Sequence, residues 1–392
     1  MARLNSSKSF FQKGLDTCFI LSSPFQLLCA VEAKNEFDIN DSHFVFTLYE
    51  NHQRNPQLFQ MAKDLGIKYD VCYVDNIKWQ DYIETNPQII KKGNYHRFFI
   101  GDWYECAMYM VATEYAASDY AYIGYLDDGI STMDVLRGIY RHKPSSWSGK
   151  LKYLKNNPDL NSHNAVVKHI SDYGIIDTSC YFTICHDIIN KKYQLYPNTF
   201  SHIQGSVENR IAFEGDNILV VGSFIKRDAE QFNVPLYDME ALLYTKLREV
   251  KGKYGESDTI IYIPHGSDDN AMIPKICDII GVRYQRISEP IELFSLKLAK
   301  APIAIYGIHS TALLNLKKLF HQSIVTNWFV NNKNMKDSYY EHFTALCGYF
   351  KKNGIIIENI EWREEGIKEK IRKVHDNVKG LVDFISKKIH KK

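Results

Sequence analysis

The sequence predicts an α/β protein built from two consecutive doubly wound domains, each with a parallel sheet covered by helices. The chain has 392 residues, which is enough for two domains of about 150–200 residues. In each half, short apolar runs with strand character alternate with stretches of helical period, a pattern typical of parallel α/β sheets. We expect the boundary near residue 210, with domains over 1–210 and 211–362 and a separate C-terminal helix over 363–392.

In the first half, the sheet is predicted to begin with the apolar run Thr17–Leu21. Pro24 marks the start of the helix that follows, because proline is tolerated in the first helical turn. A further helix is predicted over Glu105–Ala117, and the remaining strands are His43–Tyr49, Tyr69–Val74, His96–Ile100 and Tyr120–Leu126. The stretch 139–204 is rich in Lys, Asn, Ser and Tyr, and it predicts an insertion with surface helices and a connection.

In the second half, the alternation of strands and helices begins again at residue 217. The predicted strands are Ile218–Val221, Thr259–Ile263, Val282–Ile287, Ile303–Tyr306 and one that begins at Ile324–Val325. The predicted helices are Asp238–Lys253, Ala271–Ile280, Ile291–Ala299, Thr311–Phe320 and Met335–Lys352.

The composition excludes several classes of protein. The 48 basic and 46 acidic residues leave a net charge of +2, which is too small to indicate a nucleic-acid partner. Eight scattered cysteines without a C-x-x-C pair predict reduced thiols and no zinc site. The N-terminal residues have no apolar signal segment, and no run reaches the roughly 18 apolar residues of a transmembrane helix. We therefore expect a cytoplasmic protein.

The residues that directly follow the predicted strands are the candidates for a functional site, because ligands of doubly wound sheets bind beyond the carboxyl ends of the strands. In the first half these residues are Ser22, Ser23, Asp127, Asp128 and Gly129. In the second half they are Gly222, Ser223, His265, Gly266, Ser288, Glu289 and 307–311.

Asp127 and Asp128 form the most informative of these turns. Two adjacent carboxylates raise each other's pKa, and a carboxylate held at such a turn is a candidate general base. The alternative is an ordinary surface turn, since Asp-Gly is a common turn dipeptide.

The second half offers groups suited to a phosphate. His265 could protonate or hydrogen-bond a phosphate oxygen, or it could be a structural histidine. Ser310 and Thr311 stand where a helix begins, where hydroxyls, free N–H groups and the helix dipole suit an anion. They could equally be plain N-caps. Glu289 and Glu292 flank Pro290 at another helix start, where a carboxylate could accept ribose hydroxyls or complement the helix dipole.

These residues resemble the motifs of bacterial sialyltransferases and capsule polysialyltransferases of the GT-B type. The similarity rests on Asp127-Asp128-Gly129, on His265-Gly266 and on Ser310-Thr311, in this order, and on the opening run Phe19–Leu27. One position departs from the pattern, because Gly266 stands where the families have proline. Glycine loosens a turn that proline would stiffen.

The resemblance implies two Rossmann-type domains that face a cleft. It also implies an inverting, metal-independent transfer of sialic acid, or a related nonulosonic acid, from a CMP-sugar to a glycan in capsule or lipopolysaccharide synthesis. Asp127 is then the catalytic base with Asp128 as the fallback, and His265 assists the leaving CMP. Donor binding falls to Ser310, Thr311, Glu292, Glu289, Gly222, Ser223 and Gly266, and Ser22, Ser23 and Gly129 lie on the acceptor side.

Two other functions stay open at this point. The chain could be a GT-B transferase with another donor, such as CMP-Kdo or a UDP-sugar, or a catalytically silent sugar- or nucleotide-binding protein. The C-terminal stretch repeats apolar residues at helical spacing beside many lysines. This predicts an amphipathic helix for the anionic inner face of the cytoplasmic membrane, with packing on the protein itself or a homodimer contact as alternatives.

Overall fold

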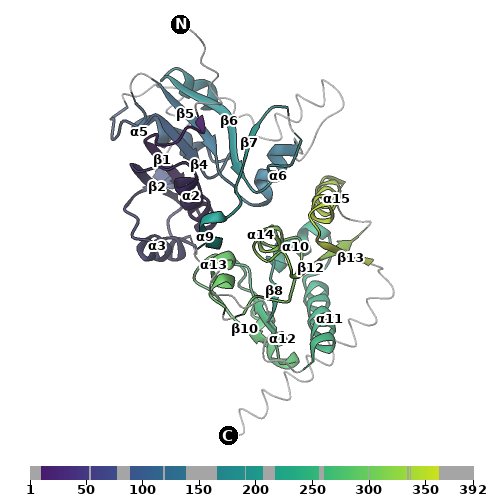
Figure 1. Cartoon of the computed structure of the whole chain (residues 1–392). Coiled ribbons are helices and arrows are strands. Elements are labelled where there is room, and N and C mark those ends of the chain that lie inside the picture. The colour runs from purple at the N-terminus through teal and green to yellow at the C-terminus, as the bar shows by residue number, and fades with distance from the viewer. Residues whose placement is uncertain are drawn as a thin grey trace. The chain divides into compact units, whose positions relative to one another are not determined.

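The computed structural model describes residues 10–361 except 53, 77–88, 118–119, 138–165, 190, 206–216, 256–259, 299, 333–334 and 336. The chain divides into two compact units (Figure 1). Unit 1 comprises Met1–Arg210 with Ser288–Pro290, and unit 2 comprises Ile211–Ile287 and Ile291–Lys392.

Unit 1 is built on a parallel seven-stranded sheet in the order β3-β2-β1-β4-β5-β6-β7. Its strands are β1 (Thr17–Leu21), β2 (Ser42–Leu48), β3 (Tyr69–Tyr73), β4 (Arg97–Ile100), β5 (Ala121–Tyr125), β6 (Ile175–Thr183) and β7 (Gln194–Pro197). Its helices are α2 (Pro24–Glu36), α3 (Asn55–Asp64), α5 (Cys106–Tyr115), α6 (Ile130–Arg137) and α9 (Ser201–Gly205), with a 3₁₀ turn over Val74–Asn76.

Unit 2 has a parallel six-stranded sheet in the order β10-β9-β8-β11-β12-β13. The strands are β8 (Ile218–Val221), β9 (Ile260–Ile263), β10 (Arg283–Tyr284), β11 (Ala304–Gly307), β12 (Ile324–Asn331) and β13 (Ile356–Glu361). The helices are α10 (Ile225–Phe232), α11 (Leu236–Tyr254), α12 (Met272–Ile280), α13 (Ile291–Leu296), α14 (Ala312–Leu319) and α15 (Asp337–Lys352). Helices α10, α11 and α12 pack in sequence on one another, and α13 packs on α14.

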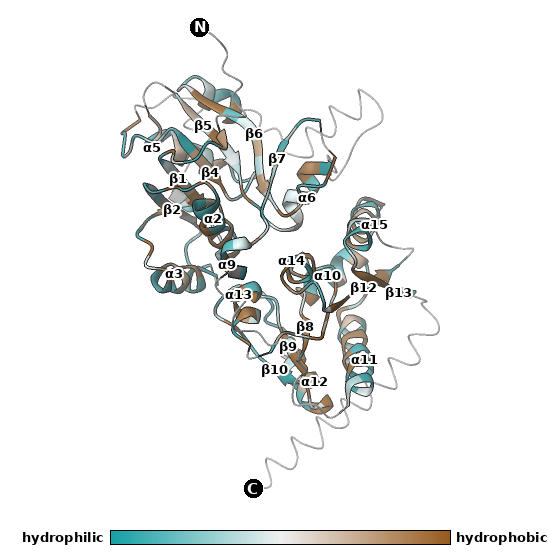
Figure 2. Ribbon diagram, in the orientation of Figure 1, coloured by the Kyte–Doolittle hydropathy of each residue, from teal (hydrophilic) through white to brown (hydrophobic). Residues whose placement is uncertain are grey.

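The central strands form because they are almost entirely apolar. Every residue of β1, β8 and β9 is buried, as expected for parallel strands that have helices on both faces. In Figure 2 the brown, apolar colour follows β8 and β9, whereas the teal of α3 marks a helix with a largely polar surface.

The predicted fold class is confirmed, because both sheets are parallel and doubly wound. Numbered within its own unit, each sheet contains the order 3-2-1-4-5-6, which is the strand order of Rossmann-type folds. In each unit, the second and third strands therefore lie on one side of the first strand. On its other side lies the fourth strand, which the chain reaches by a long crossover. These switch points lie between β1 and β4 and between β8 and β11. The predicted cleft between the domains stays a prediction.

The prediction for the stretch 139–204 is wrong in its second part. Instead of an insertion, this part supplies β6 and β7, which extend the parallel sheet beyond β5. The first half of β6 is partly exposed, and Ser179 has a positive φ of 53° that interrupts its pairing. Because of these polar residues, the segment does not form an apolar run, and the sequence pattern does not indicate a strand. Residues 138–165 lie outside the described part of the chain.

Three further elements differ from the expectation. Helix α10 and strand β13 were not predicted, and β10 is only two residues long. The predicted amphipathic helix over 363–392 lies outside the described residues. Within the described part of the chain, no helix is long and apolar enough to cross a membrane.

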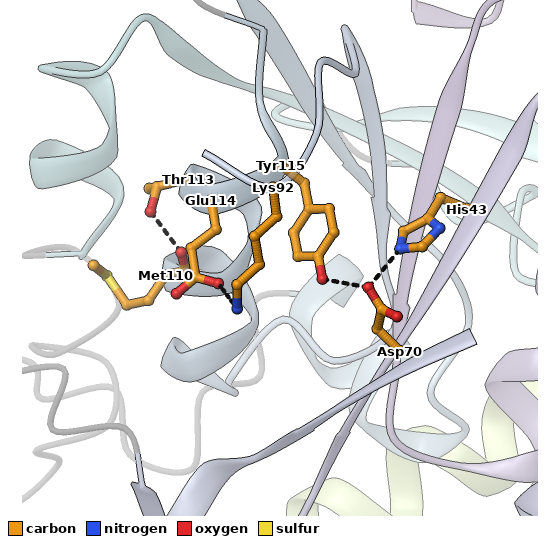
Figure 3. Close-up of polar contacts among 7 residues, drawn as sticks. All are labelled: His43, Asp70, Lys92, Met110, Thr113, Glu114 and Tyr115. Atoms are coloured by element: carbon orange, nitrogen blue, oxygen red, sulfur yellow. Dashed lines mark hydrogen bonds and ion pairs between the residues drawn. The ribbon is translucent and has the colours of Figure 1, made fainter. Parts of the chain in front are cut away.

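Side-chain contacts fasten the amino edge of the unit 1 sheet, opposite the edge where ligands of such sheets bind. Asp70 Oδ2 accepts a hydrogen bond from the Tyr115 hydroxyl at 2.7 Å and lies 3.1 Å from His43 Nε2, and Lys92 pairs with Glu114 at 2.6 Å (Figure 3). The Tyr115 hydrogen bond lowers the pKa of Asp70. These groups have a structural role that leaves the carboxyl edge open to function.

Candidate functional site

The carboxyl edge of unit 1 is organised by one glutamine at its switch point. Gln26 lies in the first turn of α2, and its Oε1 accepts hydrogen bonds from Ser22 N at 2.7 Å and from the Ser22 hydroxyl at 3.2 Å. Its Nε2 donates to Asp128 Oδ1 at 2.7 Å. The Gln26 side chain therefore connects the end of β1 with the turn after β5, across the end of β4.

Gly101, the first residue after β4, makes room for this connection. A Cβ placed on Gly101 would lie 2.2 Å from Gln26 Oε1, a separation that real Cβ atoms do not reach. The absence of a side chain at Gly101 is thus a condition for the Gln26–Asp128 hydrogen bond.

Asp127 is a buried structural carboxylate. It is 1% exposed, Oδ1 accepts from the Thr183 hydroxyl, and Oδ2 accepts from Ile184 N at 2.8 Å. Both carboxylate oxygens therefore accept hydrogen bonds from residues at the end of β6. A carboxylate with this burial and these partners is poorly placed to take a proton from a bound substrate.

Asp128 has the properties of a general base instead. It keeps partial exposure, and desolvation raises its pKa, although the hydrogen bond from Gln26 opposes this rise. Asp102 follows β4 and is also partly exposed. Desolvation, and next the charge of Asp128, raise the pKa of Asp102. Desolvation thus raises the pKa of both carboxyls, and the charge of Asp128 adds to the rise at Asp102.

The other predicted residues of unit 1 hold the backbone of this edge. The Ser23 side chain caps α2 by accepting Gln26 N at 3.2 Å. Gly129 has a φ of 63°, a conformation that favours glycine, where the chain turns from Asp128 into α6. Thr132 accepts the Asp128 N–H at 2.7 Å and fixes the same turn.

In unit 2, two glycines allow close approach of the backbone at the switch point between β8 and β11. A Cβ on Gly222 would lie 2.6 Å from the Tyr262 hydroxyl, and one on Gly307 would lie 2.9 Å from the carbonyl oxygen of Val221. The predicted turn Gly222-Ser223 is therefore a tightly packed start to the helix α10.

The start of α14 presents a threonine hydroxyl that does not cap the helix. Thr311 is the N-cap residue, yet its side chain makes no capping hydrogen bond. Before it, His309 has a φ of 46°, and its N–H donates to Asn327 Oδ1 at 2.7 Å. Burial lowers the pKa of His309 to about 3, so the ring is neutral. Ser310 and Thr311 are partly exposed, and such a helix start is suited to an anion.

His265 and Gly266 form the turn after β9. The His265 Nδ1 accepts Ser267 N at 3.2 Å, and its ring lies parallel to Phe224 with centroids 6.2 Å apart. Both contacts orient the imidazole. Gly266 is not among the residues of positive φ, so its backbone does not require glycine.

Glu292 is buried, and its Oε1 accepts Asn315 Nδ2 at 2.7 Å, which links α13 to α14. Burial raises the pKa of Glu292. Glu289 is partly exposed and belongs to the short segment Ser288–Pro290, which clusters with unit 1, whereas Glu292 belongs to unit 2.

The structure adds Gln26, Gly101 and Asp102 to the candidates. Gly101 and Asp102 directly follow a predicted strand. Their position at a strand end is the same signal that marks Asp127 and Asp128, so the sequence could have indicated them. Gln26 gives no such signal, because its role depends on β1 and β4 being neighbours. No group of three His, Cys, Asp or Glu side chains that could hold a metal occurs among the described residues.

The sequence matches no protein-family model and no curated protein. Among solved structures, the chain is similar to a protein from Listeria monocytogenes assigned as a UDP-N-acetylglucosamine 2-epimerase, with 12% sequence identity and a TM-score of 0.42 over 88% of this chain and 90% of that chain. It is also similar to Phytolacca americana UGT2 in complex with UDP-2-fluoro-glucose and pterostilbene, with 10% identity and a TM-score of 0.41 over 93% and 90%.

The different environments of Asp127 and Asp128 predict opposite effects of the same substitution. Asp127→Asn places an amide NH2 opposite the Thr183 hydroxyl and removes the charge that strengthens both buried hydrogen bonds, and we expect it to destabilise unit 1 by about 1–3 kcal/mol. Asp128→Asn keeps an acceptor for Gln26 and removes a desolvated charge, so stability should stay equal or rise. Hydrogen–deuterium exchange of the β4–β6 amides measures both changes.

The pH dependence of these variants provides the control. A raised folded pKa gives stability that is present below the unfolded pKa, about 4, and is lost as pH rises through the folded value. Wild-type unit 1 should therefore lose protection as pH rises above about 4, and Asp128→Asn should reduce that loss. Equal destabilisation by both substitutions would contradict the assignment.

Proposed function

We propose that the protein is an inverting glycosyltransferase in which Asp128 is the catalytic base. The observation that carries this proposal is the Gln26 side chain, which reaches from the switch point of unit 1 to Asp128, whose pKa is raised by desolvation. Ligands of doubly wound sheets bind at this point. A base with a pKa above the ordinary aspartate range is better matched to proton transfer near neutral pH. The proposal moves the role of base from Asp127, where the resemblance put it first, to Asp128.

In the proposed reaction, Asp128 takes the proton of an acceptor hydroxyl. The acceptor oxygen attacks the anomeric carbon of the donor sugar as the bond from that carbon to the phosphate oxygen breaks, which inverts the configuration. The leaving nucleotide departs as a monophosphate. His265, oriented by Phe224 and Ser267, would donate a hydrogen bond or a proton to it.

We further propose that the donor is a CMP-activated sialic acid or a related nonulosonic acid. The support is the motif resemblance together with the start of α14, where the Thr311 side chain does not cap the helix. The N–H groups of Leu313 and Leu314 donate to backbone carbonyls of Ser310 and Thr311, so a phosphate here would be bound by the two hydroxyls and the positive end of the helix dipole. Glu292, which is buried against Asn315, and Glu289, which is partly exposed, are the candidates for the ribose hydroxyls. Gly222, Ser223 and Gly266 would line the nucleotide.

A monophosphate leaving group carries less charge than a diphosphate, so His265 and a helix start could stabilise it without a divalent metal. We accordingly propose a metal-independent transfer to a glycan or glycolipid acceptor in capsule or lipopolysaccharide synthesis, at the cytoplasmic side of the membrane. This part of the proposal rests on the resemblance alone.

Substitution of Asp128 tests the chemistry. With CMP-sialic acid and an oligosaccharide acceptor, Asp128→Asn should lower kcat by about 10²–10⁴-fold, because general base catalysis contributes that much. The Kd for CMP should not change. The matched control is Asp41→Asn, which neutralises an exposed aspartate of unit 1 and should retain wild-type turnover. Wild-type turnover in Asp128→Asn would refute the assignment.

Substitution at the start of α14 tests the donor site. Ser310→Ala and Thr311→Ala should each weaken CMP binding by about tenfold, the loss expected for one hydrogen bond to a charged phosphate. The control Thr245→Ala removes an exposed hydroxyl from α11. Calorimetry with CMP, UDP and GDP also tests the nucleotide: we expect binding of CMP, and preference for UDP would indicate another donor.

A further inference from the structure

His309 is a buried histidine that the proposed reaction does not use. It follows β11 at the switch point of unit 2 and directly precedes Ser310. The residue is 5% exposed, and among the described residues neither its Nδ1 nor its Nε2 has a hydrogen-bond partner. Buried polar groups are almost always paired, so an exception at the edge of a candidate site calls for an explanation.

The imidazole lies in a box of three phenylalanine rings, the aromatic box. Its centroid is 4.4 Å from the ring of Phe343 on α15, and 5.3 Å from the rings of Phe232 on α10 and Phe329 on β12. These rings give a ring nitrogen no ordinary hydrogen-bond partner. Because the histidine is neutral in these surroundings, it has one N–H donor and one acceptor nitrogen, and both are left unused.

The backbone of His309 is strained as well. Its φ of 46° is a left-handed conformation that is uncommon for a residue with a side chain. The His309 N–H donates to Asn327 Oδ1 at 2.7 Å, which holds this conformation. A phenylalanine would fill the aromatic box without burying unpaired nitrogens. Two local costs to stability thus coincide at one residue, and such costs are typical of functional positions.

A neighbouring histidine shows the contrast. His265 also follows a strand of unit 2, but its Nδ1 accepts the N–H of Ser267 at 3.2 Å, and its φ is not positive. The position of His265 is therefore stabilised by its own contacts. His309 has no comparable contact through its side-chain nitrogens, although its chain neighbours Ser310 and Thr311 are the residues that we assign to the donor phosphate.

We propose that His309 is a further phosphate ligand of the donor site, and that the aromatic box holds it in a resting position. On binding of the donor beside Ser310 and Thr311, the backbone of His309 moves to the ordinary negative φ, and the imidazole leaves the box. Its N–H then donates to a phosphate oxygen of the nucleotide. Both local costs are relieved in the bound state, because the ring gains a partner and the backbone is no longer left-handed.

The inference rests on the proposed function, since it requires a nucleotide phosphate at the start of α14. NMR of the full chain tests it on the imidazole itself. In the free protein, the His309 ring protons should carry ring-current shifts from the aromatic box. CMP or UDP, whichever binds, should remove these shifts, whereas cytidine and uridine lack the phosphate and should leave them in place.

The variants His309→Phe and His309→Asn assign these resonances by their absence. Asparagine tolerates the left-handed conformation better than phenylalanine does, whereas phenylalanine suits the aromatic box better. The two substitutions therefore place different demands on folding, and either one is sufficient for the assignment.

His309→Phe also separates ligand binding from packing. Because no unpaired nitrogen stays buried, the Tm should rise by about 2–4 °C. Nucleotide binding should weaken by about tenfold, the loss expected for one hydrogen bond to a charged phosphate. The matched control is His169→Phe in unit 1, because His169 is 7% exposed and its Nε2 also lacks a partner among the described residues. This control should leave nucleotide affinity unchanged.

Two results would overturn the inference and leave the donor site intact. They are a nucleotide that binds without moving the His309 resonances, and a His309→Phe protein that binds nucleotide as tightly as the wild type. Equal shifts with a nucleotide and its nucleoside would overturn the assignment to the phosphate. Calorimetry that detects binding of neither CMP nor UDP would refute the proposed donor site and this inference together, so the two failures are distinguishable.

Discussion

The hydrogen bond from Gln26 to Asp128 is the interaction on which the candidate site depends. It brings the first turn of α2 to the turn after β5, and it can form only because Gly101 has no side chain at the end of β4. The same glutamine accepts both donors of Ser22, so its amide orientation is fixed. One side chain thus orders the carboxyl edge at the switch point and orients the carboxylate that we assign as the base.

The two adjacent aspartates show how the fold gives identical side chains different chemistry. Both carboxylate oxygens of Asp127 accept hydrogen bonds from the end of β6. Asp128 accepts a hydrogen bond from Gln26, and its charge raises the pKa of Asp102. Unit 2 has comparable features. Gly222 and Gly307 allow close packing of the backbone at the ends of β8 and β11, and the Thr311 side chain makes no capping hydrogen bond at the start of α14. In both units, the functional candidates are side chains that the fold holds in place but whose hydrogen-bonding capacity is not fully used within the protein.

The sequence predicts those parts of the molecule that depend on local pattern. The compact, largely apolar run Thr17–Leu21 is β1 with the predicted bounds. The expectation that functional residues follow the strands leads to the turn Asp127–Gly129. Strand β6 is not predicted, because polar residues and the positive φ of Ser179 interrupt its strand pattern. Gln26 is not predicted for another reason, since its hydrogen bonds depend on the sheet order that places β4 beside β1. Which of two neighbouring aspartates is available to a substrate is also decided by such long-range contacts.

The assignment of Asp128 as the base depends on Asp128 and Asp102 forming a desolvated pair of carboxyls whose charges raise each other's pKa. A pH titration of the aspartate carboxyl carbons by NMR, with resonances assigned through Asp128→Asn and Asp102→Asn, tests this pair. We predict that the pair titrates well above the ordinary aspartate value of about 3.9, and that each substitution lowers the pKa of the remaining partner. Titration of both carboxyls at the ordinary value, unchanged by either substitution, would contradict the account.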